Sequence, residues 1–207
     1  MARYSMDLRA EQTAVARRRI LAAAVELFTS NGYLGTKLAE VAKAAGVSVQ
    51  TVYNVVGNKA ALLKAAYDVT VAGDDEPVPI ARREVVQAML AASSGRECLA
   101  LYARMARALG ERVLKLQVVL HGQAATGDPD LVAFVAVTDR ERRVGAENLV
   151  RHVGERFGLA VEAGVAADIV WNLTSPQVVD GFVSGCGWGW ERFEGWLAGA
   201  LADSLLV

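Results

Sequence analysis

Residues 36–62, which read TKLAEVAKAAGVSVQTVYNVVGNKAAL, decide the fold of the N-terminal part of this 207-residue chain. Gly46 separates two short segments of helical periodicity, because glycine readily takes the left-handed conformation that ends a helix. Thr36 and Ser48 stand where a hydroxyl can cap the first and the second of these helices. Two short helices joined by a tight glycine-containing turn, behind a longer helix, are typical of a helix-turn-helix.

Helical segments are predicted on both sides of this motif. Residues 16–28 repeat apolar side chains at helical spacing, and Gly32 is expected to end that amphipathic helix. Asn58 is predicted to cap a further helix, which continues to Gly73. A linker is expected at 73–79, where Gly, Asp, Glu and Pro accumulate.

The remainder of the chain is also predicted to be helical. Asp128 and Ser175 each precede a proline and are expected to cap helices, since proline fits the first helical position. No alternation of period two is long enough for a sheet, so an all-α fold is predicted. Breaks between the helices are expected near residues 93–95, 127–129, 158 and 185–189.

The charge of the chain is unevenly distributed, although its formal net value is −1. Residues 1–64 hold nine Lys or Arg against four Asp or Glu, a net charge of +5. The remaining residues hold 13 basic against 19 acidic side chains, a net charge of −6. A basic head on an acidic body is what a phosphate-binding module joined to a domain without a nucleic-acid role requires.

The sequence lacks the signals of membrane insertion, secretion and metal binding. No stretch is apolar enough for a transmembrane helix and no apolar run follows the basic start, so a cytoplasmic protein with no membrane partner is expected. Cys98 and Cys186 are far apart and have no histidines beside them at metal-ligand spacing. Free thiols are expected, with no metal and no cofactor.

An all-α enzyme is the main alternative from another class of protein. The sequence contains no HExxH, GxSxG, P-loop or GxGxxG motif, and His121 and His152 lack obvious acidic partners. The run Gly185-Cys186-Gly187-Trp188 superficially resembles the surroundings of a thiol-protease nucleophile. A glycine-rich connection between helices explains this run more simply, so the chain is expected not to be an enzyme.

The motif closely resembles the DNA-binding head of the tetracycline-repressor (TetR) family, whose pattern is roughly T-x-x-x-I-A-x-x-A-G-V-S-x-G-T-L-Y-x-Y-F-x-x-K-x-x-L. The resemblance covers residues 13–67. Departures are Gln50, where a small residue is common, and Val55-Val56, where aromatics are usual; Val56 is expected to loosen the joint to the fourth helix. The matching positions are Thr36, Ala42, Ala45, Gly46, Val47, Ser48, Thr51, Tyr53, Lys59 and Leu62, with Val41 and Val52 as conservative replacements.

The resemblance implies that the third helix enters the major groove of DNA, which is about 12 Å wide. Ser48, Val49 and Gln50, at its N-terminal end, are expected to face the bases. The resemblance makes the Thr36, Tyr53 and Lys59 positions phosphate contacts, and a helix N-terminus also attracts phosphate. The predicted DNA-binding residues are Thr36, Lys37, Ser48, Val49, Gln50, Thr51, Tyr53, Asn54 and Lys59.

A weaker resemblance continues over residues 171–179 and 187–197, which are similar to the last helices of many family members. In those proteins the terminal helices form a four-helix dimer interface, which implies a homodimer here. The alternative is that the apolar stripe of the last helix belongs to the core of a single chain. The predicted interface residues are Trp190, Phe193, Trp196, Leu197, Leu201 and Leu205.

Family members also keep a ligand cavity in the C-terminal helical bundle, which implies a small-molecule effector. The few polar candidates on inward faces suggest a mostly hydrophobic effector, although plain core packing explains each candidate equally well. The predicted effector-binding residues are Tyr102, Met105, Gln117, His121, Phe134, Trp171 and Asn172.

The expected function is that of a transcriptional repressor that binds palindromic operator DNA and is released by its effector. Residues 1–64 would form the DNA-binding domain, with the fourth helix to about residue 72 as connector, and residues 73–207 would bind effector and dimerise. The effector would change the separation of the two recognition helices, because adjacent half-sites lie about 34 Å apart. The alternative regulator has no small-molecule input and responds to a protein partner.

Overall fold

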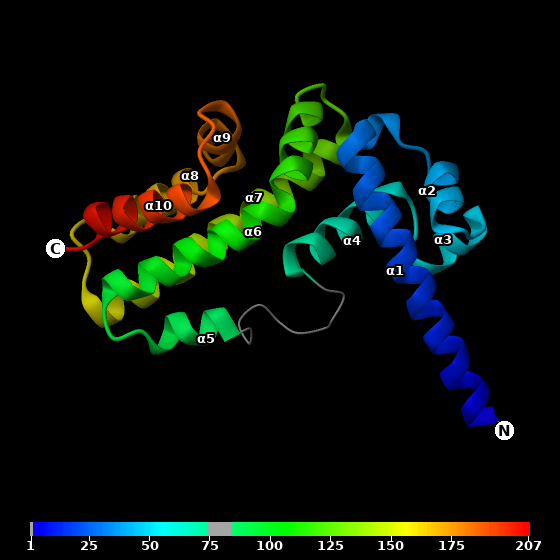
Figure 1. Ribbon diagram of the computed structural model, residues 1–207, viewed down its shortest axis with the longest axis horizontal. Coiled ribbons are helices and arrows are strands. Elements are labelled where there is room, and N and C mark those ends of the chain that lie inside the picture. Colours follow the sequence, from blue (N-terminus) through cyan, green and yellow to red (C-terminus); the bar gives the residue numbers. More distant parts are fainter. Residues whose placement is uncertain (1, 74–83) are drawn as a thin grey trace. The chain divides into compact units, whose positions relative to one another are not determined.

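The computed structural model describes residues 2–73 and 84–207, with side chains from residue 10 onward. Within these residues every regular element is a helix, so the all-α prediction is confirmed (Figure 1). Apart from Gly73, the expected linker lies outside the described residues. The helices are α1 (Ala2–Gly35), α2 (Leu38–Ala45), α3 (Val49–Val55), α4 (Lys59–Ala72), α5 (Glu84–Ala91), α6 (Gly95–Ala124), α7 (Pro129–Phe157), α8 (Ala163–Leu173), α9 (Pro176–Asp180), the π-helix η2 (Gly181–Gly185) and α10 (Trp190–Leu205).

The described helices include none that is long and apolar enough to cross a membrane. Nor do the described side chains bring together three His, Cys, Asp or Glu residues in an arrangement that could hold a metal ion.

Four helices begin where the sequence predicts a capping side chain. The Ser48 hydroxyl accepts the backbone N–H of Thr51 at 3.0 Å, and the Asn58 amide oxygen accepts that of Ala61 at 2.8 Å. These two bonds satisfy donors that a helix N-terminus otherwise leaves open. The predicted caps Asp128 and Ser175 make the same kind of bond, to Leu131 and Val178.

The start of α2 differs from the prediction, because its capping position is Lys37 and not Thr36. Thr36 is 1% exposed, and its hydroxyl lies 2.7 Å from the carbonyl oxygen of Gly32 and 3.1 Å from that of Leu27. The hydroxyl thus bonds back to α1. Gly32, with φ of 72°, interrupts α1 as predicted, although α1 begins at Ala2, well before residue 16.

The described residues form two compact units. Unit 1 contains α1–α4 together with Lys115–Val135, which are the end of α6 and the start of α7. Unit 2 contains α5, α6 up to Leu114, and the chain from Ala136 onward. The predicted division of the chain at residue 73 does not include the packing of Lys115–Val135 with the N-terminal helices.

The core of unit 1 joins the helix-turn-helix to this returning segment. Tyr67 of α4 is 5% exposed, its hydroxyl accepts the Gln117 amide at 2.8 Å, and its ring lies 5.1 Å, centroid to centroid, from Phe134. Buried aromatic pairs of this edge-to-face kind add stabilisation beyond the area they bury. The other large buried side chains of unit 1 include Ile20, Leu21, Phe28, Leu62, Leu63, Leu116, Leu120 and Leu131.

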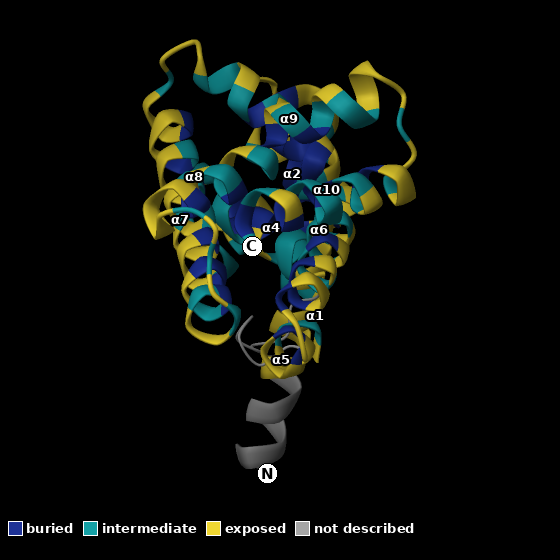
Figure 2. Ribbon diagram, turned by 90° about the vertical axis from the view of Figure 1, so that its left-hand side faces the viewer, coloured by how far each residue is buried: buried dark blue, intermediate teal, exposed yellow. Residues whose placement is uncertain are grey.

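The core of unit 2 contains the apolar stripe of α10. Phe193, Leu197, Leu201 and Leu205 are each 0% exposed in the single chain and pack among buried residues of the other unit 2 helices. These four side chains therefore belong to the core of the single chain, which was the alternative to the predicted dimer interface, and the interface itself stays a prediction. Trp190 and Trp196 remain partly exposed (Figure 2 colours the ribbon by burial).

Truncation of this stripe is expected to destabilise the protein. Leu197→Ala should lower the free energy of unfolding by about 2–5 kcal/mol, because it leaves a cavity in a closed core. Val144, 47% exposed on α7, is the control, and Val144→Ala should change it by less than about 0.5 kcal/mol. Urea titrations at equal protein concentration measure both values. Equal effects of the two substitutions would contradict the placement of Leu197.

Candidate nucleic-acid interface

The turn between α2 and α3 fixes the direction in which α3 leaves the body of unit 1. Gly46 has φ of 67°, a left-handed conformation that glycine adopts without strain. The N–H of Val47 then bonds to the carbonyl of Ala42 at 3.0 Å, which closes the end of α2. Val52, the buried residue of α3, is 0% exposed and anchors this helix, which packs against α1 and α2.

The opposite face of α3 is open to solvent and polar. Tyr53 is 49% exposed, Val49 is 38% exposed, and Gln50 and Asn54 are also exposed. The Gln50 amide nitrogen donates to the Asn54 amide oxygen at 2.9 Å, a pairing that the spacing of four residues along a helix permits. Side-chain amides offer both donors and acceptors, which is what the edges of bases in a major groove require.

The N-terminus of α3 is ordered by a short local network. The Ser48 hydroxyl lies 2.8 Å from the Thr51 hydroxyl as well as accepting the Thr51 N–H. Ser48 is exposed and Thr51 is partly buried. Both hydroxyls therefore stand at the edge of the exposed face with their positions set before any partner arrives.

Lys59, the first residue of α4, is held by an aromatic ring and by acidic neighbours. Its ammonium lies 4.2 Å from the centroid of the Tyr33 ring, within the range of a cation–π contact. The Tyr33 hydroxyl donates to Asp130 at 2.6 Å, and burial, followed by this bond, raises the pKa of Tyr33. Burial lowers the pKa of Lys59, while Asp128 and Asp130 act in the opposite sense. The contact with the Tyr33 ring therefore fixes the position of the Lys59 ammonium.

The predicted DNA-binding residues divide by exposure into three groups. The exposed ones are Lys37, Ser48, Val49, Gln50, Tyr53 and Asn54. Thr51 and Lys59 are partly buried. Thr36 is buried, and its hydroxyl is bonded within the chain, so its side chain is not presented to a phosphate.

Three of the predicted effector-binding residues lie in unit 1, with the DNA-binding helices. Gln117 is 9% exposed and bonds to Tyr67, and Phe134 is 8% exposed and packs on the same ring. His121 is partly buried. Gln117 and Phe134 thus pack in the core of unit 1.

The other four predicted effector-binding residues lie in unit 2. Tyr102, Met105 and Trp171 are partly buried against its core, and burial raises the pKa of Tyr102. Asn172 is exposed, and its amide donates to the carbonyl of Asp168 on its own helix. A hollow in unit 2 is lined by residues of α7, by Leu159 and by residues of α8, and includes none of these four.

Arg142 lies against Trp171 in unit 2, a contact that the sequence pattern does not reveal. Its position within a run of charged residues suggests a solvated helix face, yet its side chain is only 18% exposed. The guanidinium donates to the carbonyl of Trp171 at 2.8 Å and to Asp139 at 3.0 Å. Only the packing of α7 with α8 could have identified it.

A capped recognition helix with one buried and one exposed face defines a helix-turn-helix DNA-binding protein. Residues 20–66 match the family model described as bacterial regulatory proteins, tetR family. The N-terminal helices therefore match the DNA-binding domain of tetR-family regulators, as the resemblance in the sequence predicted. No curated protein matches the sequence.

Solved structures of transcriptional regulators share the fold over nearly the whole chain. FadR from Bacillus subtilis in complex with stearoyl-CoA has a TM-score of 0.69 at 16% identity, over 89% of this chain and 96% of that one. The fatty acid degradation regulator FadR from Bacillus halodurans has a TM-score of 0.67 at 16% identity, over 89% and 93%. A TetR regulator from Chloroflexus aurantiacus has a TM-score of 0.62 at 19% identity, over 94% and 98%.

The cap of α3 should contribute measurably to stability. Ser48→Ala removes the acceptor for the Thr51 N–H and is expected to cost about 1 kcal/mol. Ser48→Asp restores a capping oxygen, so the free energy of unfolding should stay within about 0.5 kcal/mol of the parent. Denaturant titration compares the three proteins. A Ser48→Ala protein as stable as the parent would show that the cap is dispensable.

Proposed function

We propose that this protein is a repressor that binds palindromic operator DNA as a homodimer, with α3 of each protomer in a major groove. The observation that carries the proposal is the exposed polar face of α3. This helix is held in place by the buried Val52, by the Ser48 cap and by the left-handed turn at Gly46. Pre-ordered groups lose little conformational entropy on binding. The net charge of +5 in residues 1–64 favours approach to phosphate.

The roles of the exposed residues follow from their chemistry. Gln50 and Asn54 carry amides that can pair with base edges, so they would read sequence. Tyr53 and Lys59 carry one hydroxyl and one ammonium, which suit phosphate oxygens and would set the register of the protein on the duplex. Lys37, beside the N-terminus of α2, would add a further phosphate contact.

Selection of bound fragments from genomic DNA tests the operator proposal. A palindrome with half-sites about one helical turn apart is the expected result. Lys59→Ala should lower affinity about five-fold at 0.15 M salt and reduce the salt slope by about 1, without a change of sequence preference. Gln50→Ala should instead alter the preferred base at one position of each half-site.

The exposed Lys115, outside the helix-turn-helix, serves as the control, because Lys115→Ala should leave both affinity and slope unchanged. Selection that yields no common sequence, together with no binding at low salt, would refute the proposal.

We propose that the dimer forms through the outer faces of α8 and α10, which pack side by side in unit 2. Support comes from Gly195 and Gly199 on α10, because a Cβ at either position would meet no atom within 4 Å. Val165 of α8 is 45% exposed, and Trp196 is partly exposed. Small residues allow close approach of helices, and a two-fold axis would repeat the same patch on both partners.

A charged side chain on this face is expected to separate the protomers. Gly195→Glu meets no neighbour within the chain but would bury an unpaired carboxylate in the dimer, so analytical ultracentrifugation should show a shift to monomer. Gly122→Glu, at an equally open position of α6, is the control and should not shift the equilibrium. A Gly195→Glu protein that stays dimeric would place the interface elsewhere.

We also propose that a small, mostly hydrophobic effector binds in unit 2 and releases the operator. Tyr102, Met105 and Trp171 support this, because they are aromatic or apolar side chains that remain partly exposed at the edge of the unit 2 core. Stearoyl-CoA is the first probe, since a protein of the same fold was solved with it. It should raise the melting temperature and displace labelled operator.

The two parts of stearoyl-CoA, coenzyme A and stearate, serve as controls. Free coenzyme A should have no effect if the apolar chain supplies the affinity, and stearate should then act alone. Stabilisation by operator, with none by any small molecule, would favour a regulator that responds to a protein partner.

A further inference from the structure

Arg19 of α1 reaches the turn of the helix-turn-helix. A Cβ built on Gly46 would lie 2.4 Å from an Arg19 guanidinium nitrogen and 3.5 Å from its central carbon. The guanidinium therefore lies directly over the turn, two residues before Ser48, the cap of the recognition helix. Arg19 is nevertheless exposed to solvent.

The charge of Arg19 is not used within the described part of the chain. No hydrogen bond or ion pair of its guanidinium occurs among the described residues, whereas Arg17 does take part in an interaction. The carbonyls at the end of α2 do not need it either. Those of Ala42 and Lys43 already accept the N–H groups of Val47 and Gly46, at 3.0 and 3.2 Å.

We propose that Arg19 is a further DNA-contacting residue, which binds a backbone phosphate at the rim of the groove that α3 enters. This inference rests on the proposed operator binding. In a helix-turn-helix the N-terminal end of the recognition helix faces the bases, and the first helix of the pair crosses the backbone. A cation at the joint between these helices lies where the groove ends and phosphate begins, and a guanidinium matches the geometry of phosphate oxygens.

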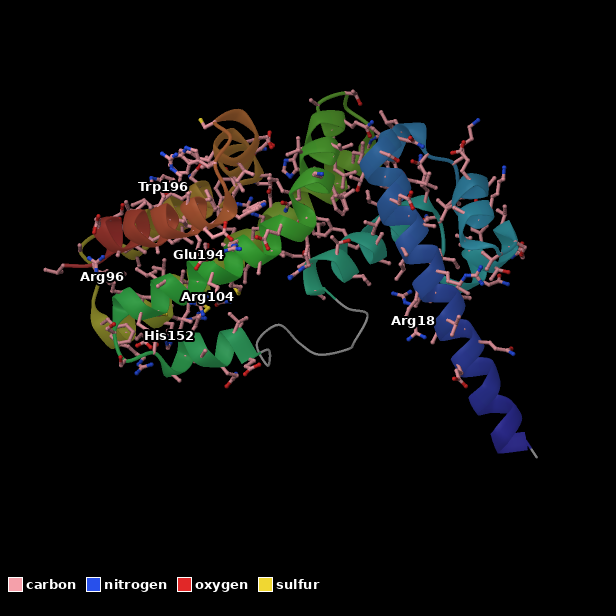
Figure 3. The ribbon with its side chains drawn as sticks, in the orientation of Figure 1. Arg18, Arg96, Arg104, His152, Glu194 and Trp196 are labelled. Carbon is pink, nitrogen blue, oxygen red and sulfur yellow. The ribbon has the colours of Figure 1, made fainter. Side chains whose placement is uncertain are left out.

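Arg18 provides a matched control, because it has the same charge, is exposed, and precedes Arg19 directly. Successive residues of a helix point about 100° apart, so the two side chains leave α1 in different directions. Figure 3 shows Arg18 on the flank of α1 that looks away from α2 and α3. Loss of either arginine removes one positive charge, but only Arg19 contacts the turn.

Binding of the genomically selected operator by the full-length protein, measured from 0.05 to 0.3 M salt, tests the proposal. Arg19→Ala should lower affinity about five-fold at 0.15 M salt and reduce the salt slope by about 1, because one phosphate contact is lost. The preferred sequence should not change, since phosphate contacts carry no base information. Arg19→Lys should restore the slope, and Arg18→Ala should stay within about two-fold of the parent.

Equal losses for Arg18→Ala and Arg19→Ala would overturn the proposal, since they would reveal only the general effect of net charge. An Arg19→Ala protein with parental affinity and slope would overturn it as well. Circular dichroism melting of each variant confirms that the fold is retained. If the parent itself fails to bind duplex DNA, the proposed function fails and not this assignment alone.

Discussion

The recognition surface depends on the burial of one face of α3. This helix has seven residues, and helices shorter than about 12–15 residues are marginal in water by themselves. Val52 closes the inner face, Gly46 sets the entry angle, and the Ser48 hydroxyl accepts the free N–H of Thr51. Because these constraints all act on the inner side and at the start of the helix, the outer side is free to carry amides and a phenol. The inner face of α3 thus stabilises the fold, and its outer face is available for recognition.

Unit 1 extends this support with residues from far along the chain. The end of α6 and the start of α7 bury Leu116, Leu120 and Leu131 and pair Gln117 with Tyr67 of α4. Asp130 binds Tyr33, whose ring lies beside the Lys59 ammonium. The orientation of a proposed phosphate contact therefore depends on residues about seventy positions later in the sequence. Since α6 and α7 continue unbroken into unit 2, a covalent helical connection links the support of Lys59 to the proposed effector-binding unit.

In unit 2 the aromatic residues gather around Phe193 of α10. Phe193 lies in the core with Trp190, Trp196 and Phe182 around it, at centroid distances of 6.1, 5.8 and 6.2 Å. The cluster lets α10 bury a large apolar area within one chain and leaves glycines on its outer face. Any association through α10 then relies on close approach and shape rather than on the large side chains that its sequence displays.

The sequence alone determined the class of fold, the helix breaks at Gly46 and Gly158, the caps at Ser48 and Asn58, and the family that the DNA-binding helices match. These features follow from local chemistry, because a cap or a left-handed turn involves residues within four positions of each other. The tertiary structure decided which residues of a helical stripe meet which partners. It placed Thr36 inside the fold, the α10 stripe in the core of one chain, and Gln117 beside Tyr67. It also placed Arg142 against Trp171 of α8 and Arg19 over the turn at Gly46. Periodicity shows that a face is apolar or charged, but only three-dimensional packing shows what covers it.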